Sequence, residues 1–455
     1  MSEKVSAKTK LLYGVASSGL EMLTSIVQFY LLFFYTEVAR IDPALVGTAL
    51  MAGKLSWDAI NDPLIGHWSD RTRSRWGRRR PYMLFGALPL ALVTFLLFSI
   101  PAGLKGTAAF LVVLFSYLLF DSFHSLVRVP YCSMTPELSF DYDERTSLTT
   151  VREVFTVIGY IIGAAATTAV VDYFMKSRGL GLGRAYSAMG AVFGLFAAVT
   201  VLVSAFGVRE RADALLKPSA STPLTSMLGA FRNKPFMRLI AAGFLTSFGF
   251  TLLTSLMPYF LSYQIDMAAQ MPIVMFAMLA TIGIFLFPMK LVSDRIGKGR
   301  AYALGLLVAC AACAGTFLLG PASRTWIYAV AVVAGMGFSA QWVCPWSMLP
   351  DVVEYDQART GERNEGVYYG MWEFMGKFTN ALGIAVSGWA LSLFGYVPGA
   401  AQSARALLGI RLFFGPLPSL AILLALPLLF FYPISRASHA RMVEELRAKA
   451  GAGGS

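Results

Sequence analysis

Charged side chains are scarce in this sequence. Asp, Glu, Lys and Arg make up 14% of its 455 residues, whereas a soluble protein carries about 25%. Hydrophobic residues supply 56%, and the mean hydropathy is +0.61. Because so much apolar surface suits an apolar solvent, the composition excludes an ordinary soluble domain. It predicts an all-α protein that crosses a lipid bilayer many times.

Histidine and cysteine are also few. The three histidines form no HExxH motif and no GxSxG motif is present, so we expect neither an enzyme nor a cofactor. The lack of an attached soluble domain argues against a sensor. The four cysteines, Cys132, Cys310, Cys313 and Cys344, lie in or beside apolar runs, which excludes a disulfide framework. We attribute the CxxC of Cys310 and Cys313 to helix packing and not to a metal site.

Basic residues outnumber acidic ones, and the net charge is +12. The loop 69–80, "SDRTRSRWGRRR", contains six arginines, whereas 101–106 has one base and 263–269 has none. Basic loops on one side of the bilayer set membrane topology. We therefore expect both termini in the cytoplasm, with the chain in the inner membrane. This pattern explains the positive charge without a nucleic-acid partner.

The sequence contains twelve apolar runs of about 20 residues, each long enough to span a bilayer. They lie near 11–35, 44–67, 81–100, 107–131, 149–171, 185–208, 236–262, 270–291, 300–319, 325–348, 366–394 and 407–432. The first run is too long for a signal peptide and lacks a cleavage site. The runs therefore predict twelve transmembrane helices.

A polar stretch divides these runs into six and six. We expect a six-helix bundle in 1–208, a cytoplasmic linker in 209–235, a second bundle in 236–432 and a cytoplasmic tail in 433–455. Two motifs recur in the two halves. "SMTPE" at 133–137 matches "SMLPD" at 347–351, and "SDRTRSRWGRRRPY" resembles "SDRIGKGRAY". Such a parallel repeat is typical of one large transporter fold, and we expect the chain to act as a monomer.

The second repeated motif places charges at helix ends. Asp70 and Arg71 follow the second run, and Asp294 and Arg295 follow the eighth. Opposite charges at helix ends can pair across loops and with helix dipoles. We interpret these residues as a conformational latch that pairs in one conformer and releases in another. The alternative is that the arginines only set the topology.

Two aspartates lie inside the second apolar run. Asp58 and Asp62 are four residues apart, so they share one helix face. One charged side chain at the centre of a bilayer costs about 2.5–3.5 kcal/mol on the insertion scale. The pair is understandable if a cation, Na⁺ or H⁺, binds between them. A structural salt bridge from Lys54 to Asp58 is the alternative, and the eighth run offers no second carboxylate site.

Further ionisable and aromatic side chains are expected at similar depth, as candidates for contact with a solute. They are Glu21, Asp121, Arg128, Arg152, Trp342, Trp372 and Lys377. For Lys377 the alternative is a helix-stabilising pair with Glu373, and for the tryptophans it is packing or an interfacial belt. We expect His124 to be a packed, hydrogen-bonded residue.

The stretch "WDAINDPLIGHWSDRTRSRWGRRRPY" resembles the glycoside–pentoside–hexuronide:cation symporter family of the major facilitator superfamily. The similarity begins at "YGVASSGLEMLTSIVQFYLLFFYTEV" and extends to the last apolar run. The resemblance implies the twelve-helix, 6+6 pseudo-symmetric fold and sugar symport coupled to Na⁺ or H⁺. It assigns Asp58 and Asp62, with Asn61 between them, to the cation site. It also makes Glu21 and Arg152 sugar ligands and brings Lys377 near the cation.

This chain departs from the sugar carriers at one position of the fourth run. Arg128 stands where those carriers have an acid that binds sugar and cation. Asp121, Arg152 and "MLPDVVEYDQ" are instead similar to the sodium-dependent lysophosphatidylcholine symporters. An arginine suits a phosphate or carboxylate as well as a hydroxyl. The sequence therefore leaves three solute classes open: a glycoside, an acidic glycoside such as a uronide, or a lysophospholipid.

Overall fold

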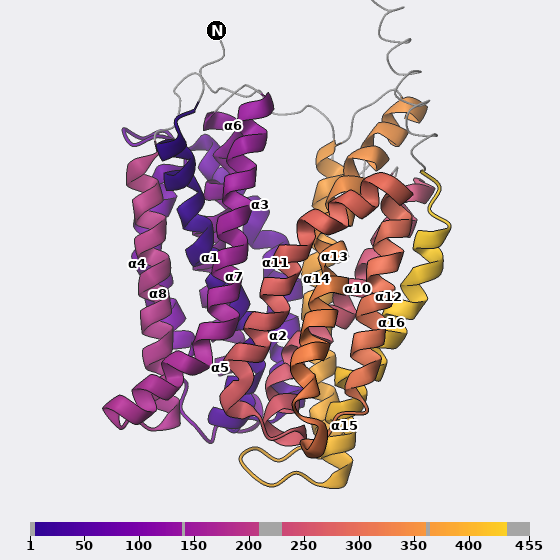
Figure 1. Cartoon of the computed structure of the whole chain (residues 1–455). Coiled ribbons are helices and arrows are strands. Elements are labelled where there is room, and N and C mark those ends of the chain that lie inside the picture. The colour runs from indigo at the N-terminus through magenta and orange to yellow at the C-terminus, as the bar shows by residue number, and fades with distance from the viewer. Residues whose placement is uncertain (1–4, 139–141, 209–229, 361–364, 435–455) are drawn as a thin grey trace, which may run out of the picture.

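The computed structural model describes residues 5–138, 142–208, 230–360 and 365–434. Every regular element within these ranges is a helix, and the long helices run side by side (Figure 1). The side chains of Asp58 and Asp70 lie outside the described residues, although their backbones belong to helices.

The described residues of the first half form ten elements. They are α1 (Ala7–Phe33), η1 (Phe34–Val38), α2 (Pro43–Gly53), η2 (Lys54–Asp58), α3 (Ala59–Arg71), α4 (Arg80–Leu97), α5 (Gly106–Ser133), α6 (Thr135–Leu138), α7 (Tyr142–Arg178) and α8 (Leu182–Gly207). The second half contains α10 (Lys234–Tyr259), η3 (Phe260–Gln264), η4 (Ala268–Gln270), α11 (Met271–Ile296), α12 (Lys298–Thr316), η5 (Pro321–Ser323), α13 (Trp326–Thr360), α14 (Glu365–Leu393), α15 (Ala404–Phe414) and α16 (Pro416–Phe430). Of the short elements, η1, η2 and η3 are π-helical.

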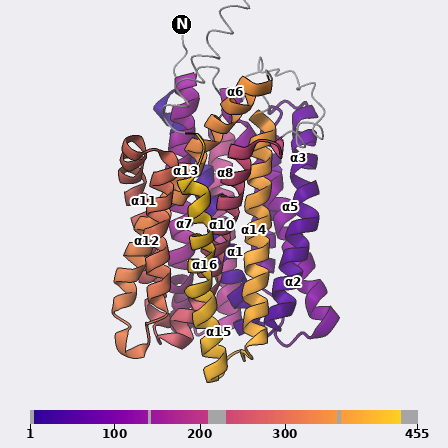
Figure 2. The same cartoon turned by 90° about the vertical axis from the view of Figure 1, so that its right-hand side faces the viewer.

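Ten helical stretches of the described chain are long and apolar enough to cross a membrane, which confirms an all-α membrane protein. The predicted runs 44–67 and 366–394 have no counterpart among these ten. The structure forms them as α2–η2–α3 and α14, which run along the bundle with their neighbours (Figure 2). Both contain polar and charged residues that lower their hydropathy. The count of twelve spans therefore stays a prediction.

The two halves pack their helices in the same pattern. In the first half α1 contacts α7 and α8, α4 contacts α5 and α8, and α2 contacts α5. In the second half α10 contacts α14 and α16, α12 contacts α13 and α16, and α11 contacts α13. Each pair of contacting helices in the first half thus corresponds to a pair in the second half whose helices have the same positions in the chain order of that half. This packing agrees with the repeat seen in the sequence.

Small residues allow the closest helix contacts. A Cβ at Gly159 of α7 would lie 2.1 Å from the carbonyl oxygen of Ser18 in α1. Between the halves, a Cβ at Gly388 of α14 would lie 2.3 Å from the carbonyl oxygen of Pro43, the first residue of α2. Glycine is required at both crossings because no real Cβ approaches an oxygen so closely.

The halves are joined most tightly at the end of the bundle opposite the N-terminus, the lower end in Figure 1. Beside the Gly388 crossing, the indole N–H of Trp389 donates to Thr48 Oγ1 at 2.9 Å. One helical turn away, the Ser392 hydroxyl donates to Asp42 Oδ2 at 3.3 Å. We call this the outer end, because it would face outward with the N-terminus in the cytoplasm, as the sequence predicts. Its contacts connect the start of α2 to the last turns of α14.

Substitution Gly388→Ala is expected to open the outer end, because the added methyl group forces α14 away from α2. The measurement is alkylation of Thr24→Cys, in a chain without other cysteines, by a membrane-impermeant thiol reagent added from the outer side. We expect labelling several-fold faster than in the parent. Gly315→Ala in α12 is the matched control, because a Cβ there meets nothing within 4 Å. Equal rates in both variants would contradict the role given to the crossing.

Candidate functional site

A cavity of about 230 Å³ lies between the halves at mid-depth. Its walls come from α1, η2, α3 and α5 of the first half, whereas the second half contributes residues of α14 alone. Four charged residues that the sequence singled out line it together: Asp62, Asp121, Arg128 and Lys377. Glu373, one turn before Lys377, also lines the cavity. The polar faces of α3 and α14 are therefore turned toward each other and away from lipid.

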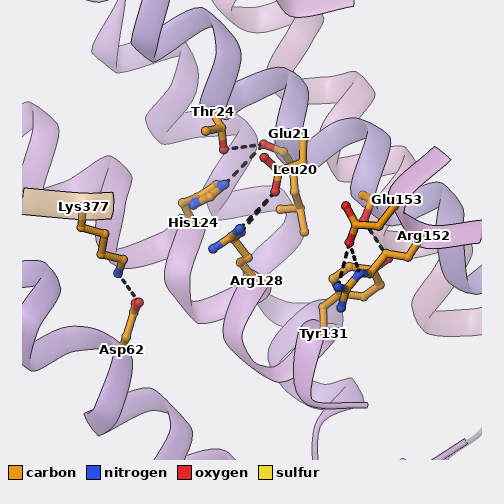
Figure 3. A network of polar contacts seen from close by, with 11 residues as sticks. Leu20, Glu21, Thr24, Asp62, His124, Arg128, Tyr131, Arg152, Glu153 and Lys377 are labelled. Atoms are coloured by element: carbon orange, nitrogen blue, oxygen red, sulfur yellow. Dashed lines mark hydrogen bonds and ion pairs between the residues drawn. The ribbon is translucent and has the colours of Figure 1, made fainter. Parts of the chain in front are cut away.

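Asp62 and Lys377 form an ion pair across the two halves (Figure 3). The Lys377 ammonium donates to Asp62 Oδ2, and the two side chains are 30% and 27% exposed. The other carboxylate oxygen, Oδ1, is buried and has no hydrogen-bond partner among the described residues. Buried oxygens are normally satisfied. An unsatisfied carboxylate oxygen in a cavity is an available ligand for a hard cation.

Asn61 connects α3 to α5. Its amide nitrogen donates to Asp121 Oδ2 at 3.3 Å, and only 4% of the residue is exposed. Asn61 therefore fixes Asp121 beside the cavity, and its role as a cation ligand stays a prediction. The role of Asp58 also stays a prediction, because its side chain is outside the described residues. Its backbone ends the π-helix η2, and π-turns inside helices are frequent at functional sites.

Lys54 makes a second polar contact between the halves. Its ammonium donates to Asn380 Oδ1 at 2.7 Å and lies 5.5 Å from the centre of the Tyr117 ring. Asn380 lies three residues after Lys377, so both face α2–η2–α3 from one side of α14. The two contacts run in opposite directions, each half donating one ammonium to the other. The alternative pair of Lys54 with Asp58 is untested by the described side chains.

Glu21 and Arg128 pair within the first half. Arg128 Nε and Nη2 both lie 3.3 Å from Glu21 Oε1 (Figure 3). These are long contacts for an ion pair, and the Arg128 side chain is 39% exposed. One turn earlier, the His124 ring stacks on Phe120 with Nε2 3.4 Å from the Leu20 carbonyl oxygen. This is the packed, hydrogen-bonded histidine that the sequence predicts.

Four predicted solute ligands are not among the residues that line the cavity. Glu21 lies behind Arg128, to which it is paired. Arg152 forms an ion pair with its neighbour Glu153 at 2.8 Å. Trp342 meets the Tyr160 ring edge-on, with centroids 5.6 Å apart. Trp372 is 9% exposed and packs near Trp346, with centroids 6.4 Å apart. Their contact with a solute stays a prediction.

Sequence reasoning missed the neutral polar residues of the cavity, among them Gln28 and Asn380. The Tyr160 hydroxyl donates to Gln28 Oε1 at 2.6 Å, and Gln28 Nε2 donates to Thr254 Oγ1 in the other half at 3.2 Å. A signal was present in both cases. Gln28 is seven residues after Glu21 and Asn380 three residues after Lys377, so each shares a helix face with a predicted site residue.

The predicted latch is only partly described. The side chain of Asp70 lies outside the described residues, and Arg71 is exposed. Asp294 and Arg295 line a second cavity, of about 640 Å³, at the end of the bundle that holds the N-terminus. There Lys298 pairs with Asp351 at 2.7 Å, an ion pair that sequence reasoning missed although Asp351 belongs to the repeated motif. The latch itself stays a prediction.

Comparison with known proteins identifies the family. A family model described as MFS/sugar transport protein matches residues 12–436. The chain belongs to this family. The transporter is 30% identical to an uncharacterized symporter of Synechocystis, over 98% of both chains. Its relatives are transporters and not enzymes, as the sequence predicts.

Two further relatives have more specific names. The isoprimeverose transporter of Lactiplantibacillus pentosus is 29% identical, over 96% of this chain and 90% of that one. A sodium-dependent lysophosphatidylcholine symporter of Danio rerio is 27% identical, over 94% and 85%. Among solved structures, a variant of the nucleoside transporter NupG superposes with a TM-score of 0.66 at 15% identity, covering 92% and 99%. At that identity the likeness shows the fold alone.

Removing one partner of the Asp62–Lys377 pair is expected to destabilise the transporter. Lys377→Gln leaves the Asp62 carboxylate without its ammonium, which costs about 1–3 kcal/mol for a partly buried group. In the double variant with Asp62→Asn, the free energy of unfolding should fall by less than the sum of the decreases in the two single variants. The measurement is chemical unfolding in detergent without Na⁺.

The control for this cycle is the exposed pair of Asp172 and Lys176 on α7, whose side chains are 48% and 77% exposed. Such an i, i+4 pair contributes only about 0.3–0.5 kcal/mol. Additive losses at Asp62 and Lys377 would mean that their contact contributes nothing to stability.

Proposed function

We propose that this transporter is a symporter that couples the entry of Na⁺, or H⁺, to the uptake of a sugar or glycoside. The observation that carries the proposal is Asp62, which lines the cavity between the halves and whose Oδ1 is buried without a hydrogen-bond partner among the described residues. A carboxylate with one oxygen held by an ammonium and the other without a donor can accept a cation on that second oxygen. Asp58, one turn earlier in the sequence, supplies a second carboxylate, and Asn61 a neighbouring amide.

The Asp62–Lys377 pair suggests how cation and conformation are coupled. One carboxylate cannot fully neutralise both Na⁺ and an ammonium, so a cation on Oδ1 weakens the hold of Lys377 on Oδ2. Since Lys377 belongs to α14 and Asp62 to α3, this changes a contact between the two halves. A ligand shifts a conformational equilibrium only through such differential contacts. Alternating access would then rock two six-helix bundles around the cavity.

The cavity favours a small polar solute. Its volume of about 230 Å³ lies just below the usual range of ligand pockets, roughly 300–1,000 Å³. Arg128, Gln28 and Asn380 line it and offer donors and acceptors at several points, as a polyhydroxylated ring requires. Arg152, Trp342 and Trp372 would join these ligands only after the halves rearrange. The relationship to an isoprimeverose transporter supports the same solute class.

A lysophospholipid or other acidic amphipathic solute is the second candidate. The observation in its favour is Arg128, which presents a guanidinium to the cavity and has long contacts to Glu21. A phosphate binds a guanidinium by two parallel hydrogen bonds. The relationship to a lysophosphatidylcholine symporter points the same way. A uronide would use the same guanidinium.

We further propose twelve spans, in which α2–η2–α3 and α14 are the two that carry charged residues to the cavity from opposite halves and fall short of the hydropathy of the other ten. The bundles would comprise 1–208 and 236–432, joined by the linker 209–235 and followed by the tail 433–455. The transporter would be a monomer in the inner membrane, with both termini in the cytoplasm. In this orientation the outer end faces away from the cytoplasm. Asp70, Arg71, Asp294 and Arg295 would then form the latch on the cytoplasmic side.

Asp62→Asn is expected to abolish cation-driven accumulation while leaving part of the solute exchange intact, because the solute site survives when the cation site loses its charge. The measurement is uptake of labelled solute into vesicles with and without a Na⁺ or H⁺ gradient. Asp172→Asn, in the exposed pair of α7, should accumulate solute like the parent. Unchanged accumulation in Asp62→Asn would remove Asp62 from the cation site.

The solute is identified by uptake of a labelled panel of neutral glycosides, uronides and lysophospholipids. We expect cation-dependent uptake of a glycoside that Asp58→Asn abolishes, since both aspartates are assigned to one site. Uptake of lysophospholipid alone would assign Arg128 to a headgroup. Uptake of uronides alone would assign it to a carboxylate.

A further inference from the structure

The outer ends of α1 and α10 are built alike. Each α-helix ends in a five-residue π-helix, η1 (Phe34–Val38) and η3 (Phe260–Gln264). Two residues after each π-helix comes a non-glycine residue in the left-handed region, Arg40 with φ of 56° and Asp266 with φ of 54°. These two are the positive-φ residues other than glycine in the described chain. Because such conformations are strained, they persist only where surrounding contacts hold them, and they cluster at functional sites.

Equivalent residues of the two ends meet each other. The Tyr263 hydroxyl donates to Glu37 Oε1 at 2.5 Å, and the two residues are 226 positions apart. Phe33 and Tyr259 have the same separation, and their rings meet edge-on with centroids 5.2 Å apart. Arg40 and Asp266 repeat this spacing. Residues related by a pseudo-two-fold axis can touch only where they lie beside it, so Glu37 and Tyr263 close the bundle on its axis.

The second oxygen of Glu37 is also held. The backbone N–H of Gly399, in the loop between α14 and α15, donates to Oε2 at 3.1 Å. Gly399 has φ of 66°, which glycine adopts without strain. The Tyr396 ring, in the same loop, packs on Tyr263 and on Tyr259, with centroids 5.8 and 5.4 Å apart. One carboxylate therefore fastens η1 to both η3 and the α14–α15 loop.

The arrangement requires a carboxylate and is reversible. Both oxygens accept from donors, and an amide in place of the carboxylate would turn an N–H₂ group toward one of them. Glu37 and Tyr263 are half-buried, whereas Thr36 and Tyr259 beneath them, whose hydroxyls lie 2.5 Å apart, are fully buried. Water can thus take over the contacts of Glu37 when they open. A fully buried carboxylate would have no such replacement.

We propose that Glu37 is a gating residue of the transport cycle: its carboxylate fastens the outer end and must release before the cavity opens to that side. The proposal rests on the alternating access of the proposed function. It assigns a role to residues outside the cavity and outside the predicted latch.

The test uses the full-length transporter with Thr24→Cys as its single cysteine and measures alkylation from each side of sealed vesicles. Glu37→Gln and Tyr263→Phe should each raise the outer labelling rate several-fold and lower the inner rate. The outer labelling rate of the double variant should be little higher than that of either single variant, because both substitutions break the same contact. Glu37→Asp, which keeps the carboxylate, should lie between Glu37→Gln and the parent.

Two controls separate gating from loss of structure. Tyr173→Phe changes an exposed tyrosine of α7 and should leave both rates unchanged. A variant that is merely destabilised would label faster from both sides, and that result, or unchanged rates, would overturn the proposal. Tyr263→Phe removes only one hydroxyl oxygen, so it can test the same contact if Glu37→Gln fails to fold. Failure of every solute in the uptake panel would refute symport without altering the labelling result.

Discussion

The ion pair of Asp62 and Lys377 is the interaction on which the arrangement of the two halves depends. Neither charge is stable alone in a lipid environment, and each belongs to a different half. The halves must therefore meet where these side chains lie. A buried pair adds little stability relative to apolar packing, but leaving one member unpaired is costly. The pair thus specifies a relative placement of the halves more than it adds to the strength of their association.

This constraint explains why α2–η2–α3 and α14 differ from the other helices. A helix in contact with lipid must be largely apolar, and ten stretches of the described chain meet that requirement. The other two contact each other, and the charged side chains Asp62, Glu373 and Lys377 line the cavity between them instead of facing lipid. The repeat determines how helices pack within each half. It does not extend to the site, where the first half supplies most of the wall and the second half only residues of α14.

The sequence predicts those features that depend on composition and on spacing along one helix. Runs of apolar residues gave the membrane class, and the repeated motifs gave two equivalent halves, which the packing matches. The expectation that Lys377 would lie near Asp62 came from resemblance, and the structure brings the two together. Pairs such as Lys298–Asp351, Lys54–Asn380 and Glu37–Tyr263 could not be predicted. They depend on the rotation of each helix about its axis, which packing against several neighbours decides.

The contacts between the halves differ in kind from the middle of the bundle to its outer end. At mid-depth they are ammonium groups on a carboxylate and an amide, in a cavity that can hold water. At the outer end they are neutral crossings at glycine, aromatic edges and hydrogen bonds to half-buried groups. Because water replaces it when it opens, a hydrogen bond between neutral groups contributes about 0.5–1.5 kcal/mol net, and one to a carboxylate such as that of Glu37 about 1.5–3 kcal/mol. A few such contacts can stabilise one conformer, yet a ligand that binds the other conformer more tightly by a few kcal/mol can overcome them. A transporter that alternates between two states requires this balance.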